Sequence, residues 1–123
     1  MFITNNERIG TCYFEFQFCK IKQPVKRNKV RTNVINHWLE DSLLLADDDF
    51  DNFFELYGNI FKCALFPNGE KGFYGYGINY YDKNTTIYIL NELKKIIEDK
   101  YYILVEWLEL AIKQYNGFYI LGL

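Results

Sequence analysis

Residues 11–19 have the sequence TCYFEFQFC, and this segment decides the fold because its side chains alternate strictly. Successive side chains of an extended chain point to opposite faces, which puts Phe14, Phe16 and Phe18 on one face. The other face carries Glu15 and Gln17. Such alternation in β-favouring residues predicts a strand with one face in the core and the other partly wetted, as in an antiparallel sheet.

Further segments predict other strands of the same sheet. The segment FYILGL, residues 118–123, lacks a polar face and is therefore expected in the centre of the sheet. CALF at 63–66 and GFYGYGINYYD at 72–82 predict shorter strands around a turn at Asn68 and Gly69. Glycines weaken a strand, so those of the second segment leave two interpretations open: a bulged strand with a tight bend, or an exposed aromatic binding surface.

Helical periodicity marks most of the remaining chain. In residues 49–61, large apolar side chains recur at the spacing of one helical face: Phe50, Phe53, Phe54, Tyr57, Ile60 and Phe61. Residues 85–99 and 101–115 show similar stripes, and Asn116-Gly117 is a typical helix stop. A fourth helix, with less regular spacing, is expected over 34–46 with Asn33 as its N-cap.

These elements define the fold class. The chain of 123 residues fits one domain, covering 1–123, and its hydrophobic fraction of 50% is enough to build a core. Strands and helices are mixed without strict alternation. We therefore expect an α+β fold, a mostly antiparallel sheet with about four helices packed on it.

Composition limits the environment and the partners. The net charge of −2 makes direct attraction to nucleic acid or to an anionic membrane unexpected. Three cysteines without a CxxC pattern predict reduced thiols, and no signal peptide is visible, so we expect a cytoplasmic protein. One basic segment, from Lys20 to Arg31, is expected to be a solvated loop, with contact to phosphate as the alternative.

The run from Asp47 to Asp51 superficially resembles a calcium-binding loop. The positions that need glycine and glutamate in such a loop hold Asn52 and Gly58 instead. Carboxylates at the start of a helix supply an N-cap and a favourable charge, which explains the run without a metal. We expect no metal site and no cofactor.

His37 is the only histidine, and no catalytic motif surrounds it. We therefore expect no catalytic residue and no enzyme. Because imidazole titrates near neutral pH, a small enzyme using His37 with a carboxylate is kept as an alternative. That alternative predicts a pocket that holds His37 beside Glu40, Asp41 or Cys63.

Acidic residues are concentrated between positions 40 and 55. The group consists of Glu40, Asp41, Asp47, Asp48, Asp49, Asp51 and Glu55. Such a density of one charge sign would steer a basic protein partner and speed the encounter, although a solubilising face is the plainer alternative. Tyrosines are expected to add rigid anchors, because interface hot spots favour Tyr, Trp and Arg. The expected anchors are Tyr74, Tyr76, Tyr80 and Tyr81.

The chain resembles the bacterial toxin-immunity proteins of contact-dependent growth inhibition and polymorphic toxin systems. The likeness lies in the length, the acidic segment 40–55, the segment GYGINYYDKNTTIYILNELKKI at 75–96 and the ending EWLELAIKQYNGFYILGL at 106–123. It implies a small cytoplasmic α+β protein that binds and neutralises a cognate toxin domain, expected to be a basic nuclease. An adaptor or a homodimer built on an exposed sheet edge is the other alternative.

Overall fold

The computed structural model describes residues 1–22, 37–66 and 68–122. In this part of the chain six strands form one antiparallel sheet, in the order β2-β1-β6-β5-β3-β4. The strands are β1 (Tyr13–Phe18), β2 (Leu43–Ala46), β3 (Ala64–Leu65), β4 (Lys71–Gly72), β5 (Ile78–Tyr81) and β6 (Phe118–Leu121). The expected α+β class is confirmed.

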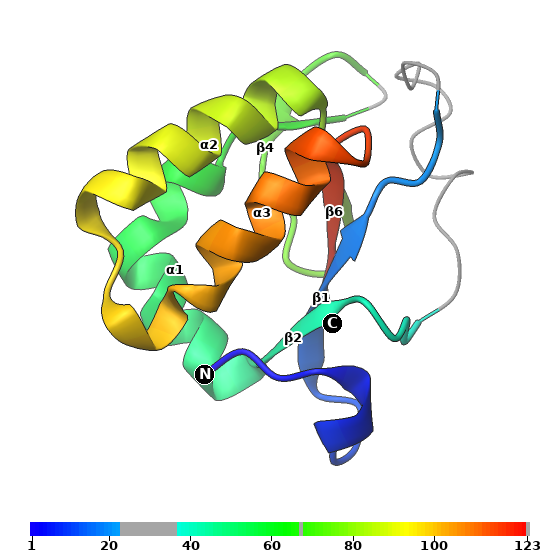
Figure 1. Ribbon diagram of the computed structural model, residues 1–123, viewed down its shortest axis with the longest axis vertical. Helices are drawn as coiled ribbons and strands as arrows, with labels where there is room; N and C mark the ends of the chain where they lie inside the picture. Colours follow the sequence, from blue (N-terminus) through cyan, green and yellow to red (C-terminus); the bar gives the residue numbers. More distant parts are fainter. Residues whose placement is uncertain (23–36, 67, 123) are drawn as a thin grey trace.

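Strands β1 and β6 lie side by side in the middle of the sheet (Figure 1). All four residues of β6 are buried, which confirms the expectation of a central apolar strand. Phe14, Phe16 and Phe18 of β1 belong to the main hydrophobic core, as the alternation predicts. The expectation that the opposite face of β1 is wetted is wrong, because Glu15 and Gln17 are 0% and 2% exposed.

The expectation of a helix over 34–46 is also wrong at the C-terminal end of that range, where Leu43–Ala46 form β2. Residues 33–36 lie outside the described part of the chain. Leu43 and Leu45 join the main core, whereas Leu44, on the opposite face of the strand, is also fully buried. Burial on both faces fits a strand paired with β1 on one side and bridged through Leu44 to Ile3 on the other.

Three α-helices, rather than about four, lie in the described residues, and they pack on the same face of the sheet (Figure 1). They are α1 (Asp47–Phe61), α2 (Lys83–Ile96) and α3 (Ile103–Lys113), with short 3₁₀ turns η1 (Asn5–Glu7) and η4 (Asp99–Tyr101). The side chain of Asp82 caps α2 by accepting from the Thr85 amide at 2.8 Å. The N-cap of α1 is Ala46, so the acidic run supplies charge in the first turn but no side-chain cap.

The core between helices and sheet is largely aromatic. Phe16 of β1 contacts Phe53 and Phe61 of α1 edge-to-face, at centroid distances of 6.4 Å in both pairs. Such edge-to-face pairs add to the free energy of burial. The helix stop after α3 is confirmed at Gly117, whose φ of +86° suits glycine and lets the chain turn into β6.

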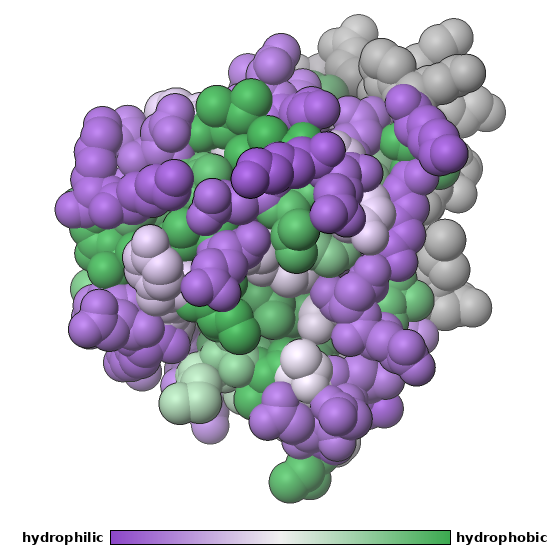
Figure 2. Space-filling model, in the orientation of Figure 1, coloured by the Kyte–Doolittle hydropathy of each residue, from purple (hydrophilic) through white to green (hydrophobic). Residues whose placement is uncertain are grey.

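None of the helices in the described segments is long and apolar enough to cross a membrane. Hydrophobic and hydrophilic residues alternate over the helical face seen in Figure 2. Exposed large hydrophobic side chains of α2 and α3 include Tyr88 and Ile103.

Candidate functional site

One end of the sheet brings two distant segments together. Strand β2 ends where β1 begins, with Ala46 opposite Tyr13, and α1 starts at the next residue. Strand β6 ends and β5 begins at the same end, with Leu121 opposite Ile78. Since β1 and β6 are antiparallel neighbours, the start of α1 and the loop that precedes β5 lie at one end of the molecule.

Phe73 joins this loop to α1. Its ring lies 4.7 Å from the ring of Phe54 and 5.7 Å from that of Phe50, measured between centroids. Phe50 in turn stacks on Phe14 of β1 at 3.7 Å. The contacts run from the sheet through the first turns of α1 to the loop, so the loop is held against the acidic helix.

Residues 73–77 form a bend that exposes two tyrosines. Tyr74 is 50% and Tyr76 75% exposed, and their rings contact each other edge-to-face at 6.2 Å. Asn79 is fully buried and fixes the bend: its Oδ1 accepts from the Tyr74 amide at 2.7 Å and its Nδ2 donates to the Tyr74 carbonyl at 2.9 Å. At Gly77 a Cβ would lie 2.4 Å from the Tyr74 ring, so a larger residue there would displace this ring. The tight bend of the first interpretation is present, and Tyr74 and Tyr76 are exposed as the second requires, but binding by this segment stays a prediction.

The outward face of α1 carries the acidic side chains. Asp48, Asp51 and Glu55 are exposed at helical spacing, and Leu56 beside them is 52% exposed. Asp49 is engaged differently, because its carboxylate pairs with the amino group of Met1. We call the following set the acidic-tyrosine surface: Asp47, Asp48, Asp51, Glu55, Tyr74 and Tyr76.

Tyr80 and Tyr81 do not belong to this surface, and the expectation that they are exposed anchors is wrong. They are 1% and 0% exposed because β5 is an interior strand. The Tyr80 hydroxyl donates to the Asn116 carbonyl at 2.9 Å and that of Tyr81 to the Phe61 carbonyl at 2.6 Å. Burial raises the pKa of both phenols well above the usual value.

Glu40 and Asp41 lie at the opposite end of β2 from α1, so the acidic segment is split between two places. They line a shallow cavity of about 230 Å³ whose floor includes Trp107 of α3. The Trp107 indole donates to the Asp41 carbonyl at 2.9 Å, which ties this segment to α3. The carboxylate of Asp41 pairs with Lys20 at 2.8 Å.

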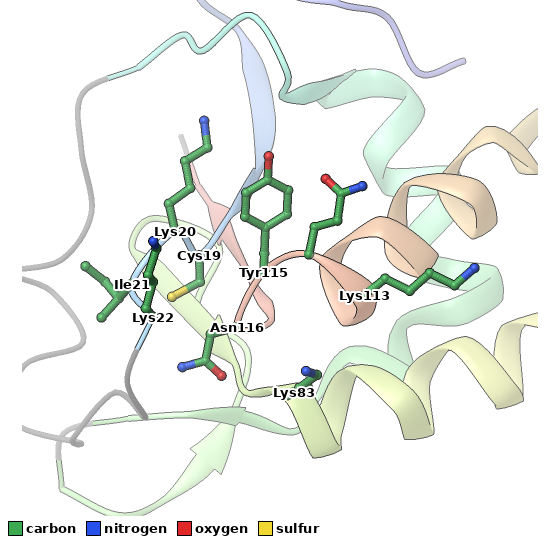
Figure 3. A pocket seen from close by; sticks show the side chains of 9 residues that line it. Cys19, Lys20, Ile21, Lys22, Lys83, Lys113, Tyr115 and Asn116 are labelled. Atoms are coloured by element: carbon green, nitrogen blue, oxygen red, sulfur yellow. The ribbon is translucent and has the colours of Figure 1, made fainter.

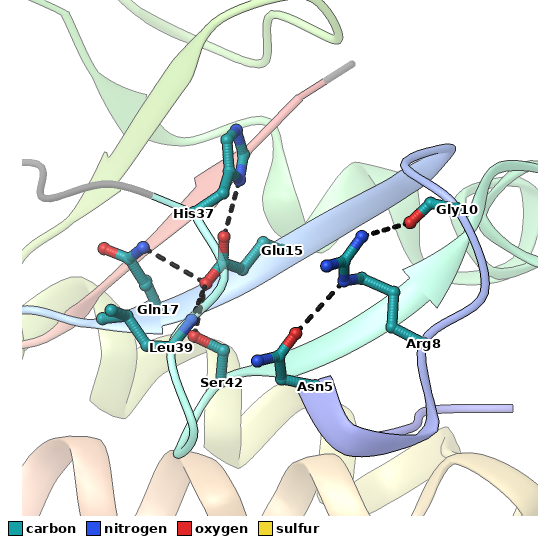
Figure 4. A network of polar contacts seen from close by, with 8 residues as sticks. All are labelled: Asn5, Arg8, Gly10, Glu15, Gln17, His37, Leu39 and Ser42. Carbon is teal, nitrogen blue, oxygen red and sulfur yellow. Dashed lines mark hydrogen bonds and ion pairs between the residues drawn. The ribbon is translucent and has the colours of Figure 1, made fainter.

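The most heavily bonded carboxylate in the described residues is Glu15, on the sheet face away from the helices (Figure 4). Its Oε2 accepts from Ser42 Oγ at 2.6 Å, from the Leu39 amide at 3.1 Å and from Gln17 Nε2 at 3.2 Å. Its Oε1 lies 2.7 Å from His37 Nδ1. Charge-assisted hydrogen bonds offset the cost of burying a carboxylate. Glu15 thus fastens residues 37–42 across β1 and β2.

His37 therefore has a carboxylate partner, but it is Glu15 rather than Glu40 or Asp41. The side chain of His37 is 44% exposed and stacks obliquely on Trp38 at 4.3 Å; the peptide bond between the two residues is cis. A carboxylate on Nδ1 would orient the ring with Nε2 directed outward. Burial raises the pKa of the Cys63 thiol, which disfavours the thiolate form that a nucleophile uses.

Among the residues that the structure describes, no three His, Cys, Asp or Glu side chains converge as a metal site would require. All three cysteines are free thiols, with Cys19 buried and Cys12 exposed. The Cys19 thiol donates to the Tyr119 hydroxyl at 3.6 Å. The Cys63 thiol donates to the Ile60 carbonyl at 3.2 Å.

Three residues that organise these sites were not singled out by the sequence. In the sequence, Glu15 looks like a strand residue that faces solvent. Its burial depends on another segment covering this face of the sheet, which the residues around Glu15 do not indicate. Phe73 and Asn79 lie in a glycine-rich segment whose partners are distant in sequence. A signal existed for Asn79, because an amide beside a glycine-rich bend often bonds backbone groups.

Comparison with known proteins gives no relative: no protein-family model, curated protein or solved structure matches this chain. The function therefore has to be argued from the surfaces.

Proposed function

We propose that this protein is a cytoplasmic immunity protein that binds a cognate bacterial toxin domain, a basic nuclease, and neutralises it stoichiometrically. The observation that carries the proposal is the acidic-tyrosine surface, which combines exposed carboxylates of α1 with two exposed tyrosines in the bend that Phe73 packs against α1. The proposal also rests on the resemblance of the sequence to toxin-immunity proteins.

The charges of this surface fit a partner that binds phosphate. A nuclease holds its substrate backbone with Lys and Arg, and these side chains would be attracted to Asp48, Asp51 and Glu55. Opposed charges raise the association rate and make it dependent on salt. An inhibitor that covers such a site would exclude the nucleic acid directly, without any chemistry of its own.

The tyrosines fit the same role. Tyr side chains bury a large area while losing little conformational freedom, which makes them frequent hot spots. Tyr76 is 75% exposed in the free protein and therefore has most of its surface still to bury in a complex. The hydrogen bonds from Asn79 to the Tyr74 backbone hold the bend in advance, which lowers the entropy cost of binding.

The described sheet edges give less support to a homodimer formed by strand pairing. Strand β4, at one edge, has two residues including Lys71, and β2, at the other, is bridged at Leu44 to Ile3. Short strands and lysines protect sheet edges from pairing with other chains.

The test is neutralisation of a toxin domain, which the proposal expects to be encoded immediately upstream of this chain. Cells that express that domain should survive when this protein is co-expressed, and the purified pair should form a one-to-one complex. Tyr76→Ala should raise the dissociation constant about thirtyfold, equivalent to about 2 kcal/mol for a hot-spot residue. The absence of a toxin gene there, or a toxin that this protein does not inhibit, would refute the proposal.

A second candidate is favoured by the 2.7 Å contact between His37 and Glu15, namely proton transfer by an imidazole oriented by a carboxylate. The two candidates differ in stoichiometry, because an inhibitor acts at equimolar amounts and an enzyme below them. His37→Ala should leave toxin neutralisation unchanged. Loss of neutralisation in His37→Ala, with an intact one-to-one complex, would favour the enzyme instead.

A further inference from the structure

The end of the sheet opposite the acidic-tyrosine surface carries a basic cavity. Its volume is about 510 Å³, and it is lined by Lys20 and Lys22 after β1, Lys83 at the start of α2, and Lys113 with Tyr115 and Asn116 at the end of α3 (Figure 3). These segments meet there because β1 ends beside the start of β6, with Phe18 opposite Phe118. A volume of this size is typical of small-molecule sites.

Within the described residues, Lys22, Lys83 and Lys113 of this cavity form no ion pair, whereas Lys20 does. No carboxylate lines the cavity itself. Asp41 pairs with Lys20, and the Asp82 carboxylate caps the Thr85 amide. An anion bound in this hollow would be attracted to the lysines that have no paired carboxylate.

The position of Lys83 adds a separate reason to expect an anion. It is the first residue of α2, where the helix dipole is positive and cations are unfavourable, and the first turn of α2 carries no acidic residue. The Asp82 carboxylate at the N-cap accepts from the Thr85 amide and offsets part of this charge. An anion bound beside Lys83 would offset more of it.

We infer that this cavity is a binding site for a small molecule that carries several phosphate groups, such as a nucleoside triphosphate. Lysine ammonium groups are compact point charges on flexible stems and suit the clustered oxygens of a triphosphate. The hydroxyl of Tyr115 and the side-chain amide of Gln114 add polar groups to the lining of the cavity. This inference is independent of the proposed function, because it concerns the other end of the molecule.

A nucleic-acid backbone fits the observations less well than a small phosphate compound. Single-stranded nucleic acid is bound along extended grooves with stacking platforms, whereas the described lysines surround one hollow. The net charge of the chain is −2, and the opposite end of the molecule would repel a long polyanion.

The experiment is calorimetric titration of the whole protein with inorganic triphosphate and with ATP at low salt. We expect binding of both in the micromolar to millimolar range, with tighter binding of ATP if the natural ligand is a nucleotide and equal binding if it is an inorganic phosphate compound. The double variant Lys83→Gln and Lys113→Gln should weaken binding at least about tenfold. Both lysines are exposed, so this variant should fold.

The matched control is the double variant Lys94→Gln and Lys95→Gln, which removes the same charge from the other end of α2. It should bind triphosphate as the wild type does. Equal weakening by both variants, or no binding of either phosphate compound at 1 mM, would overturn the inference. A short single-stranded RNA that binds this site more tightly than ATP, and is not displaced by it, would assign the site to nucleic acid and would overturn it as well.

Discussion

The ring of Phe73 packs on the ring of Phe54, with the centroids 4.7 Å apart and the planes inclined at 40°. The two residues belong to segments that are separated by the whole of β3 and β4. Their contact packs the loop that carries the exposed tyrosines before β5 against α1, which carries the acidic side chains. It is the structural basis of the proposed binding role.

Replacing Phe73 should therefore separate the two features. Phe73→Ala removes a half-buried ring from the pair with Phe54 and should cost about 1–2 kcal/mol in the free energy of unfolding, less than a fully buried ring. The loop should also become more susceptible to proteolysis near Tyr74. Leu56→Ala, at an exposed position of α1, should cost less than about 0.5 kcal/mol. Equal costs in urea unfolding would show that Phe73 does not hold the loop.

Neutralising Glu15 should loosen residues 37–42. A glutamine in its place presents an amide donor to groups that are themselves donors, such as Ser42 Oγ and the Leu39 amide. We expect Glu15→Gln to cost about 2–4 kcal/mol in the free energy of unfolding, because buried charge-assisted bonds are lost. Hydrogen exchange at the Leu39 amide should accelerate. Glu106→Gln, at an exposed site, is the control, and a loss as small as in that variant would mean that the Glu15 network is not structural.

High pH should unfold the protein through its buried tyrosines. Burial raises the pKa of Tyr80, Tyr81 and Tyr119 above the ordinary value of 10.0. The unfolded chain therefore loses its phenolic protons first, and stability is fully present below pH 10 and falls as the pH rises above it. The loss should not exceed about 1.4 kcal/mol per pH unit for each of these phenols.

The alkaline effect can be assigned by comparing unfolding curves at several pH values above 10. Tyr119→Phe removes one buried phenol and should reduce the steepness of the loss, whereas Tyr76→Phe, at an exposed position, should not. If the two variants lose stability equally steeply with pH, the buried phenols are not the cause of the alkaline loss of stability.

Two glycines with positive φ should differ in their response to a side chain. At Gly117 a Cβ would lie 2.0 Å from the Tyr81 carbonyl oxygen, whereas at Gly10 it would meet nothing within 4 Å. Gly10→Ala should cost about 1 kcal/mol from backbone strain alone, and Gly117→Ala at least about 3 kcal/mol. Thermal unfolding of both variants measures the difference. Similar costs would show that the turn between α3 and β6 requires glycine no more than position 10 does.

The elements with strong periodicity could be predicted from the sequence. The structure of the short apolar run at residues 43–45 could not. The stripes of α1, α2 and α3 and the alternation of β1 depend on local spacing. Residues 43–45 are three leucines in a row, which fit a helix face or a strand buried on both faces equally well. Only pairing with β1 and Ile3 decides between them, and that pairing is a long-range property.

The candidate site was predictable in its parts but not in its assembly. The charges near Asp48 and Asp51 and the rings of Tyr74 and Tyr76 are visible in the sequence. Their adjacency depends on Phe73, and the burial of Tyr80 depends on β5 being an interior strand. Neither fact has a local signal, because both follow from which strands become neighbours.

The most direct test of the proposed function is the association rate with the upstream-encoded toxin domain, measured against salt concentration. The double variant Asp51→Lys and Glu55→Lys should slow association at low salt by about tenfold or more and flatten the salt dependence. The matched variant Glu106→Lys and Glu109→Lys makes the same charge change on α3 and should slow it much less. Equal slowing by the two variants, or an unchanged rate in the first, would contradict the assignment of binding to the acidic-tyrosine surface.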